Sequence, residues 1–269
     1  MLRFISFILP AHNEAEHIGA ALDALTRVAA ALPPGIGHEI IVACDACTDA
    51  TASIARAGGA QAIEFDKRHI AASRNHGAAE ASRALPPDQH LYLFVDADTH
   101  ANARSVSEAI DAVASGRAIA GGAPVAFDGE IPRWSRITLP AFNTLFRWFR
   151  LTGGCFFFVR RDHFDAVAGW DESVFAGEEI NLARALKRRG RFHIVRTPVL
   201  TSGRKLRTHT TGELLSLIWH NALSGGKMLR DRDRLTLWYG PRRTDPAPTP
   251  PPSAPAPAEP APVSPRSRT

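Results

Sequence analysis

Two aspartates separated by one residue, Asp96 and Asp98, directly follow an apolar run at residues 91–95. Mg²⁺ and Mn²⁺ bind carboxylate oxygens together with water and phosphate oxygens, so a carboxylate pair at the mouth of a buried strand suits a metal held against a diphosphate. Such a metal neutralises negative charge that develops on a leaving diphosphate. The same spacing also occurs in solvated turns, where an aspartate caps the backbone. Taken alone, the pair leaves both interpretations open.

The residues around this pair predict an α/β fold. Short apolar or β-branched runs are typical of strands at 4–9, 39–44, 60–65 and 91–95, and helical patterns lie between them. Strands joined by helical crossovers form a parallel, doubly wound sheet, in which ligands bind at the carboxyl ends of the strands. The polar residues that follow the predicted strands should therefore converge: His12, Asn13, Asp45, Asp96 and Asp98.

Local signals predict the helices and the remaining strands. Asn13 and Glu16 have the spacing of a capping box, which predicts a helix from this point to about residue 31. Apolar runs at 155–159 and 192–195 predict two further strands. Helical spacing predicts the other helices at about 70–83, 134–150, 177–189 and 211–223.

Length and composition indicate one large domain. The chain has 269 residues, of which 45% are hydrophobic and 22% charged. We assign this domain to residues 1–240. Eleven of the 29 residues from 241 to 269 are proline and no apolar period runs through them, which predicts a disordered tail.

Charge and cysteine content narrow the partners and the compartment. The net charge of +5 is modest, so we expect no nucleic-acid partner. No stretch approaches the roughly 18–20 apolar residues of a membrane span, and the N-terminal segment turns polar too early for a signal peptide. Three cysteines, Cys44, Cys47 and Cys155, are too few for a disulfide framework. We therefore expect a cytoplasmic protein.

Seven short motifs make residues 4–224 resemble family 2 glycosyltransferases. The resemblance implies a Rossmann-like GT-A fold, with a mostly parallel sheet flanked by helices, a nucleotide-binding half at 1–100 and an acceptor-side half at 101–240. It also implies transfer, with inversion, of a sugar from a UDP- or GDP-sugar to an acceptor hydroxyl with Mn²⁺ or Mg²⁺. The motifs are PAHNE (10–14), CDACTDAT (44–51), RNHG (74–77), DAD (96–98), GGC (153–155), GWDE (169–172) and GEE (177–179).

The resemblance implies which residues meet the donor. Asp45 would accept a hydrogen bond from the base, and Arg74 would approach the nucleotide or its phosphates. Asp96 would meet the ribose or the metal, and Asp98 would ligate the metal directly. The complete set implied to bind the nucleotide-sugar is Pro10, Ala11, Glu14, Asp45, Arg74, Asp96, Ala97 and Asp98.

On the acceptor side, the family commonly has Glu-Asp where this chain has Glu178 and Glu179. The replacement keeps the carboxylate and lengthens its arm by one methylene group. We assign the catalytic base to Glu179, and acceptor positioning or the helix start to Glu178. Gly153 and Gly154 belong to the same acceptor side.

Residues 201–209 fall where related enzymes bring phosphate contacts or a further metal ligand. Arg204 and Lys205 are candidate diphosphate contacts. His209 is a candidate third metal ligand, beside Asp96 and Asp98.

Two features have competing interpretations. Ala46 and Cys47 replace the glycine and serine usual in the second loop, which creates a C-x-x-C with Cys44. This pair is a redox or zinc site, or else a buried strand end followed by a small turn residue. The aromatic and arginine-rich segment at 134–150 is part of the core, or else an interfacial helix that meets a lipid-linked acceptor at the membrane.

Two rival functions also fit parts of the sequence. A nucleotidyltransferase uses a metal and a similar sheet, but usually opens with a glycine-rich basic loop, and this chain has PAHNE there. A non-catalytic sugar-nucleotide-binding protein would explain the departures at Glu179 and Cys47.

Overall fold

The chain begins with the predicted alternation of strands and helices. The computed structural model describes residues 1–213, 216, 220, 227–240 and 243–245. Each of the four strands predicted in the first half is confirmed, with ends within two residues of the predicted ones. The elements of this half are β1 (Phe4–Ala11), α1 (Ile18–Ala30), β2 (Gly37–Asp45), α2 (Thr51–Ala57), β3 (Gln61–Phe65), α3 (Ile70–Glu80) and β4 (His90–Val95).

The second half adds shorter strands and the helices that surround them. The predicted strands at 155–159 and 192–195 and the helices at 134–150 and 177–189 are confirmed, whereas the helix predicted at 211–223 lies mostly outside the described residues. The elements are β5 (Thr99–His100), α4 (Ala103–Ala114), β6 (Ala120–Gly122), β7 (Val125–Phe127), α5 (Arg133–Trp148), β8 (Phe156–Arg160), α6 (Arg161–Asp165), α7 (Glu178–Lys187), β9 (Phe192–Ile194), β10 (Val199–Thr201), α8 (Arg204–Thr208) and α10 (Thr236–Tyr239).

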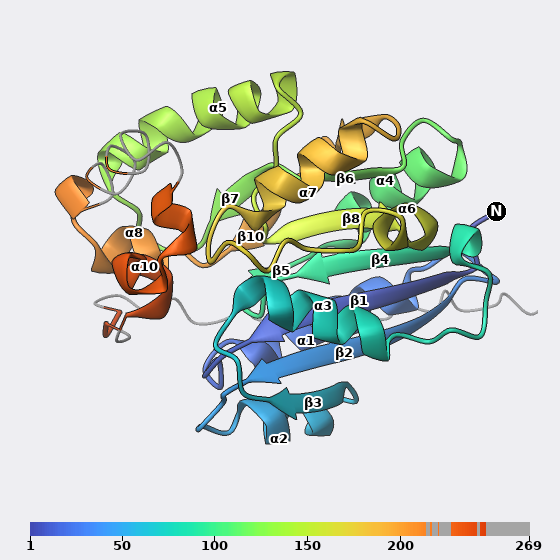
Figure 1. Ribbon diagram of the computed structural model, residues 1–269, viewed down its shortest axis with the longest axis horizontal. Coiled ribbons are helices and arrows are strands. Elements are labelled where there is room, and N and C mark those ends of the chain that lie inside the picture. Colours follow the sequence, from blue (N-terminus) through green and yellow to red (C-terminus); the bar gives the residue numbers. More distant parts are fainter. Residues whose placement is uncertain (214–215, 217–219, 221–226, 241–242, 246–269) are drawn as a thin grey trace, which may run out of the picture.

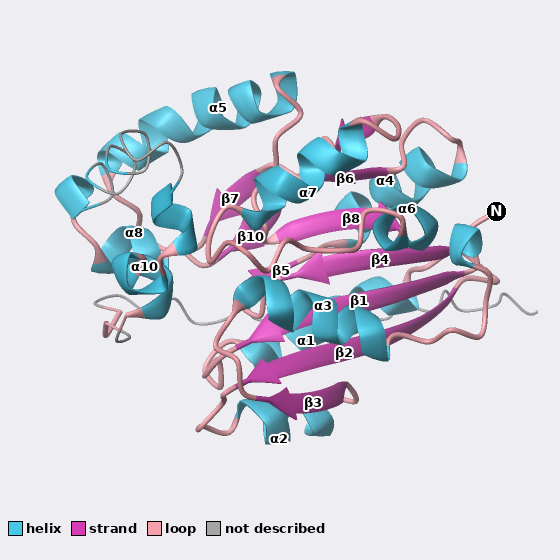
Figure 2. Ribbon diagram, in the orientation of Figure 1, coloured by secondary structure: helices cyan, strands magenta, loops and turns pink. Residues whose placement is uncertain are grey.

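Seven strands form the central sheet, in the order β3-β2-β1-β4-β8-β6-β9. β3, β2, β1 and β4 run parallel, and β9 is parallel to β6. β8 is antiparallel to both of its neighbours, so the sheet is mixed but mostly parallel. β5, β10 and β7 form a second, smaller sheet. Helices flank the central sheet on both faces (Figures 1 and 2), which confirms the predicted fold class.

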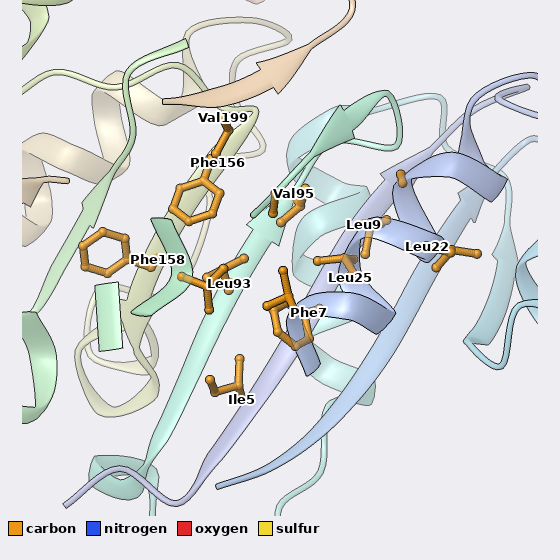
Figure 3. Packing of buried hydrophobic residues seen from close by; sticks show 14 of the residues in the cluster. Ile5, Phe7, Leu9, Leu22, Leu25, Leu93, Val95, Phe156, Phe158 and Val199 are labelled. Atoms are coloured by element: carbon orange, nitrogen blue, oxygen red, sulfur yellow. The ribbon is translucent and has the colours of Figure 1, made fainter. Parts of the chain in front are cut away.

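The core lies on both faces of the central strands. All six residues of β4 are buried, and successive side chains point to opposite faces. Leu91, Leu93 and Val95 pack in a cluster with residues of α1 and α4, part of which is shown in Figure 3. Tyr92 and Phe94 pack on the other face with residues of α3, α6 and α7. β4 is therefore fixed on both sides, which fixes the position of the aspartates that follow it.

The start of α1 differs from the prediction. The helix begins at Ile18, and its N-cap, His17, makes no side-chain capping hydrogen bond. Asn13 instead has a left-handed backbone with φ 50°, and its Oδ1 accepts the backbone N–H of Thr48 at 2.7 Å. The predicted capping box is therefore wrong, because the Asn13 side chain ties the loop after β1 to the loop after β2.

The aromatic helix α5 forms where predicted but lies outside the core. Ser135 is its only buried residue, and the side chains of Ile137 and Trp148 are 78% and 85% exposed. The interpretation of this segment as core is therefore wrong. Within the described residues, no helix is long and apolar enough to cross a membrane.

Candidate active site

A cavity of about 650 Å³ lies at the carboxyl ends of β1, β2 and β4. The prediction that separate loops converge at this edge is therefore confirmed. Every site residue predicted from the sequence except Gly153 lines the cavity: Pro10, Ala11, Glu14, Asp45, Arg74, Asp96, Ala97, Asp98, Gly154, Glu178, Glu179 and His209.

Arg74, on α3, joins the two sides of this cavity. Its Nη1 donates to Glu178 at 2.6 Å, and its Nη2 donates to Asp96 at 2.9 Å and to the Gly154 carbonyl at 3.0 Å. The side chain is 2% exposed, and its guanidinium carbon lies 4.5 Å from the centre of the Trp170 ring. A Cβ on Gly154 would lie 2.5 Å from Nη2, so a larger residue there would displace the guanidinium from its partners. In this structure, Arg74 thus holds two carboxylates in place.

Asp45, the last residue of β2, organises the loop before α3. Its Oδ1 accepts the backbone N–H groups of Lys67 and Arg68, at 2.8 and 2.7 Å. Its Oδ2 accepts the N–H of His69 at 2.7 Å and the Ser73 hydroxyl at 3.0 Å. These four donors fill the acceptor positions of the carboxylate. The expected contact with a nucleotide base therefore requires one donor to be released.

Two carboxylates, Glu14 and Asp98, meet Arg204 at the donor side. Arg204 lies 3.2 Å from Glu14 and 3.6 Å from Asp98. Burial, together with the negative charges of Glu14 and Asp96, raises the pKa of Asp98 to about 7. Burial thus outweighs the opposing charges of Lys205 and Arg204. Hard oxygen donors of this kind fit a divalent cation, which would stabilise their charged form and which Asp96 and Asp98 would hold together with donor phosphates.

His209 does not join these aspartates in a preformed metal cluster. It lines the cavity, and its Nδ1 lies 3.0 Å from the hydroxyl of Thr208. In the part of the chain that the structure describes, no three His, Cys, Asp or Glu side chains are arranged to hold a metal. The three-ligand set of Asp96, Asp98 and His209 is therefore not assembled here, because His209 follows the separate short helix α8.

Glu178 and Glu179 begin α7 and have different environments. Glu178 is 4% exposed, and its carboxylate accepts the bond from Arg74. Glu179 also lines the cavity, and burial and the charge of Glu178 raise its pKa to about 8. Gly177 precedes them with φ +74°, a backbone conformation that glycine adopts without strain.

The C-x-x-C is part of the loop packing. Cys44 is buried near the end of β2, as the structural interpretation predicted. Cys47 accepts the backbone N–H of Asn13 at 3.4 Å and donates to the Ala11 carbonyl at 3.5 Å. A hydrogen bond from Cys44 is the main cause that lowers the pKa of Cys47 to about 7.

Residues 236–240 form a wall of the cavity that the sequence patterns did not predict. The hydroxyl of Tyr239 donates to the Phe175 carbonyl at 2.8 Å, and its carbonyl accepts a bond from Arg68 at 3.4 Å. Nη1 of Arg68 also lies 2.7 Å from His12 Nε2. The adjacent aromatic residues Trp238 and Tyr239, just before the proline-rich tail, were the sequence feature that could have indicated this packing.

Comparison with known proteins identifies the family. The family model described as Glycosyl transferase family 2 matches residues 6–167. This match spans more than half of the chain, so the protein belongs to glycosyl transferase family 2 and is a nucleotide-sugar-dependent glycosyltransferase. The family assignment sets aside the nucleotidyltransferase alternative. No curated protein sequence matches the chain.

Solved structures with similar folds share little sequence with this chain. S. aureus TarS 1-349 has a TM-score of 0.56 and 13% identity, with 88% of this chain and 70% of that chain covered. Mannosyltransferase PcManGT from Pyrobaculum calidifontis, in complex with GDP-Man and Mn²⁺, has a TM-score of 0.58 and 16% identity, with coverage of 84% and 62%.

A third similar structure is glucosyl-3-phosphoglycerate synthase from Mycobacterium tuberculosis, in complex with Mn²⁺, UDP and glucosyl-3-phosphoglycerate. Its TM-score is 0.51 at 19% identity, with 85% of this chain and 80% of that chain covered. At these identities the three structures support the GT-A fold.

Proposed function

We propose that this glycosyltransferase requires Mn²⁺ or Mg²⁺ and inverts the configuration of the transferred sugar. The observation that carries the proposal is the Arg74 bridge between Asp96 and Glu178. It holds a predicted metal-binding carboxylate and an acceptor-side carboxylate next to each other in one cavity. Such fixed placement of reacting groups lowers the entropic part of a reaction barrier.

In the proposed reaction, an acceptor hydroxyl attacks the anomeric carbon of the sugar and Glu179 takes the hydroxyl proton. The bond from that carbon to the diphosphate oxygen breaks, and the nucleoside diphosphate leaves. A bound divalent cation would neutralise charge on the departing phosphates. A single displacement of this kind inverts the anomeric carbon. Glu179 suits the base role because its carboxylate is in no ion pair among the described residues, whereas Arg74 holds Glu178.

We propose a UDP- or GDP-sugar as the donor, because the structurally similar enzymes include complexes with UDP and with GDP-Man. Pro10, Ala11 and Glu14 line the pocket with Asp45. Asp45 is our candidate to read the base. The Ser73 hydroxyl already bonds the His69 carbonyl at 2.9 Å, so it can release Asp45 without losing all its partners.

Donor binding tests the metal assignment. The affinities of UDP-glucose and GDP-mannose can be measured by calorimetry, with Mn²⁺ and with a chelator. We expect at least one of these donors to bind at least tenfold more tightly with Mn²⁺. Asp98→Asn should remove that difference without lowering the melting temperature. Asp111→Asn, an exposed aspartate on α4, is the matched control and should bind as the parent does. Equal affinity of the parent with Mn²⁺ and with chelator would contradict metal dependence.

The configuration of the product tests inversion. With an active donor and acceptor, proton NMR of the first product should show the anomer opposite to that of the donor. A product with the donor's configuration would exclude the single displacement. If an identified donor binds but is neither transferred nor hydrolysed, the non-catalytic alternative is favoured.

A further inference from the structure

The helix α5 makes few contacts with the rest of the protein. Figure 1 shows it along the outer edge, away from the central sheet. Its contacts to the body include Asn143, whose side chain bonds the N–H and carbonyl of Val125 at 3.3 and 2.9 Å, and Arg147, which donates to the carbonyls of Val195 and Arg196. Ser135 is its one buried residue, so most of its surface is open.

The open surface of α5 carries a continuous apolar stripe. At about 100° per residue, its exposed large apolar side chains and that of the following Phe149 lie within an arc of about 140°. A soluble helix normally turns such a stripe inward, and an exposed apolar patch of this kind marks an interaction site. The exposed fractions are 39% for Trp134, 78% for Ile137, 45% for Phe142, 49% for Leu145, 85% for Trp148 and 60% for Phe149.

The same segment is strongly basic. Residues 133–150 include four arginines, at 133, 136, 147 and 150, and no aspartate or glutamate. A neighbouring helix adds to this charge, because Lys187 of α7 donates to the Phe149 carbonyl at 3.0 Å. Burial and the charges of Arg150 and Arg184 lower the pKa of Lys187, as expected for cations brought close together. The surface defined by residues 133–150 and Lys187, here the α5 face, is therefore apolar and cationic.

We propose that the α5 face docks on the surface of an anionic lipid bilayer. Tryptophan and other apolar side chains enter the boundary between headgroups and acyl chains. Arg133 lies at the margin of the apolar stripe, and the other three arginines add positive charge on the polar side of the helix, which attracts anionic headgroups. A symmetric dimer through this face would bring two sets of four arginines together, which disfavours a second copy as the occupant. Charge complementarity thus selects the lipid surface.

The α5 face is joined to the active site by a short segment of chain. The chain runs directly from Trp148 to Gly154, which lines the cavity and contacts Arg74. The proposal does not depend on the metal, the base or the donor assigned above, because binding of lipid vesicles requires no catalysis. Its failure would leave the proposed reaction unaffected.

Co-sedimentation with vesicles tests the proposal. We expect the full chain to bind vesicles of phosphatidylglycerol and phosphatidylcholine at 3:7, and at least tenfold more weakly to phosphatidylcholine alone. Arg133→Glu/Arg136→Glu should weaken anionic binding by about tenfold or more. Ile137→Glu/Trp148→Glu should weaken it similarly, because this variant removes apolar contacts with the lipid and adds negative charge. Arg27→Glu/Arg117→Glu is the control, with the same change in net charge at exposed positions on α1 and after α4.

A second measurement uses the unaltered protein. Tryptophan emission should be quenched by brominated lipid in the anionic vesicles, and Trp148→Phe should reduce that quenching. Absence of vesicle binding by the parent, equal binding to neutral vesicles, or equal loss in the Arg27/Arg117 control would each overturn the proposal. Sedimentation equilibrium that shows a dimer lost only in Ile137→Glu/Trp148→Glu, without vesicle binding, would assign the face to a second copy instead.

Discussion

The guanidinium of Arg74 donates to Glu178, Asp96 and the Gly154 carbonyl while it stacks against Trp170. A planar fork with several fixed donors suits this arrangement, and the single ammonium of lysine does not. The neighbouring carboxylates raise the pKa of Arg74 against the opposing effect of burial, so it stays charged. Loss of one carboxylate would leave part of that buried charge without a partner.

Glu178→Gln should therefore lower the free energy of unfolding by about 2 kcal/mol, because the amide keeps the shape but not the charge that balances Arg74. Urea denaturation of parent and variant measures this. Glu64→Gln provides the control, since Glu64 pairs with Arg56 at a site where both side chains are more than half exposed. That change should cost about 0.5 kcal/mol or less. Equal losses in the free energy of unfolding for the two variants would contradict a stabilising role of the buried Arg74–Glu178 ion pair.

Glu179 should determine how the transfer rate depends on pH. A base acts when it is deprotonated, and the pKa of Glu179 is raised to about 8 by burial and Glu178. We expect kcat/KM, which reports the pKa values of the free enzyme, to rise with pH and to reach half of its maximum near pH 8. Glu179→Gln should lower kcat by about 10²- to 10⁴-fold and leave donor affinity nearly unchanged.

The raised pKa of Glu179 should also make the stability of the protein depend on pH. A carboxyl whose pKa is higher in the folded state binds more protons when folded, so stability should fall as pH rises from about 4.5 to about 8. Glu179→Gln should lack its share of that fall in urea titrations. For catalysis, a Glu179→Gln variant that keeps the parent's kcat and pH profile would show that the base is another residue. Asp171 and Glu172 are then the next candidates.

At the scale of elements, the loop after β2 contains a strained residue. Ala46 has φ +52°, and its N–H donates to the Phe65 carbonyl at 2.7 Å. An alanine in the left-handed region costs about 1 kcal/mol relative to glycine. Ala46→Gly should therefore raise the free energy of unfolding by about 0.5–1 kcal/mol, measured by urea denaturation, despite the added freedom of the unfolded chain.

Ala79→Gly, at an exposed position in α3, is the comparison for that test. Glycine in a helix lowers stability by about 0.5–1 kcal/mol, so this variant should change in the opposite direction. If both variants lose stability, the left-handed conformation of Ala46 is not the strained one.

Sequence patterns predicted the strands better than the loops. β4 was predictable because each of its residues is buried, so its apolar run is unbroken. The capping box at Asn13 failed because its partner, Thr48, is distant in sequence. The antiparallel direction of β8 and the four donors around Asp45 likewise depend on contacts between remote segments, which local periodicity does not encode.

At the scale of the whole molecule, contacts extend beyond the predicted end of the domain at residue 240. Asp245 lies 2.6 Å from Arg207, whose side chain is 5% exposed, and Arg243 pairs with Glu213. A chain that ends at Gly240 should therefore melt several degrees lower, because Arg207 loses a buried partner. A chain that ends at Asp245 should melt like the parent, since Val263 is the only apolar residue larger than alanine or proline in residues 246–269.

Scanning calorimetry of both truncated chains measures this difference. Asp245→Asn in the full chain is the control and should reproduce most of the loss seen on truncation at Gly240. Identical melting temperatures for the two truncated chains would show that the Asp245–Arg207 pair contributes nothing.

The wall formed by residues 236–240 has a consequence for the order of events during synthesis. The ribosome releases the strands β1 to β4 and their aspartates early, and Tyr239 only after all of them. A nascent chain can thus assemble the sheet while one side of its pocket is still missing. A chain stopped before residue 236 should therefore form the sheet but bind the donor more weakly than the full chain, as measured by circular dichroism and calorimetry. Full affinity for the nucleotide then appears only after residue 240 has left the ribosome.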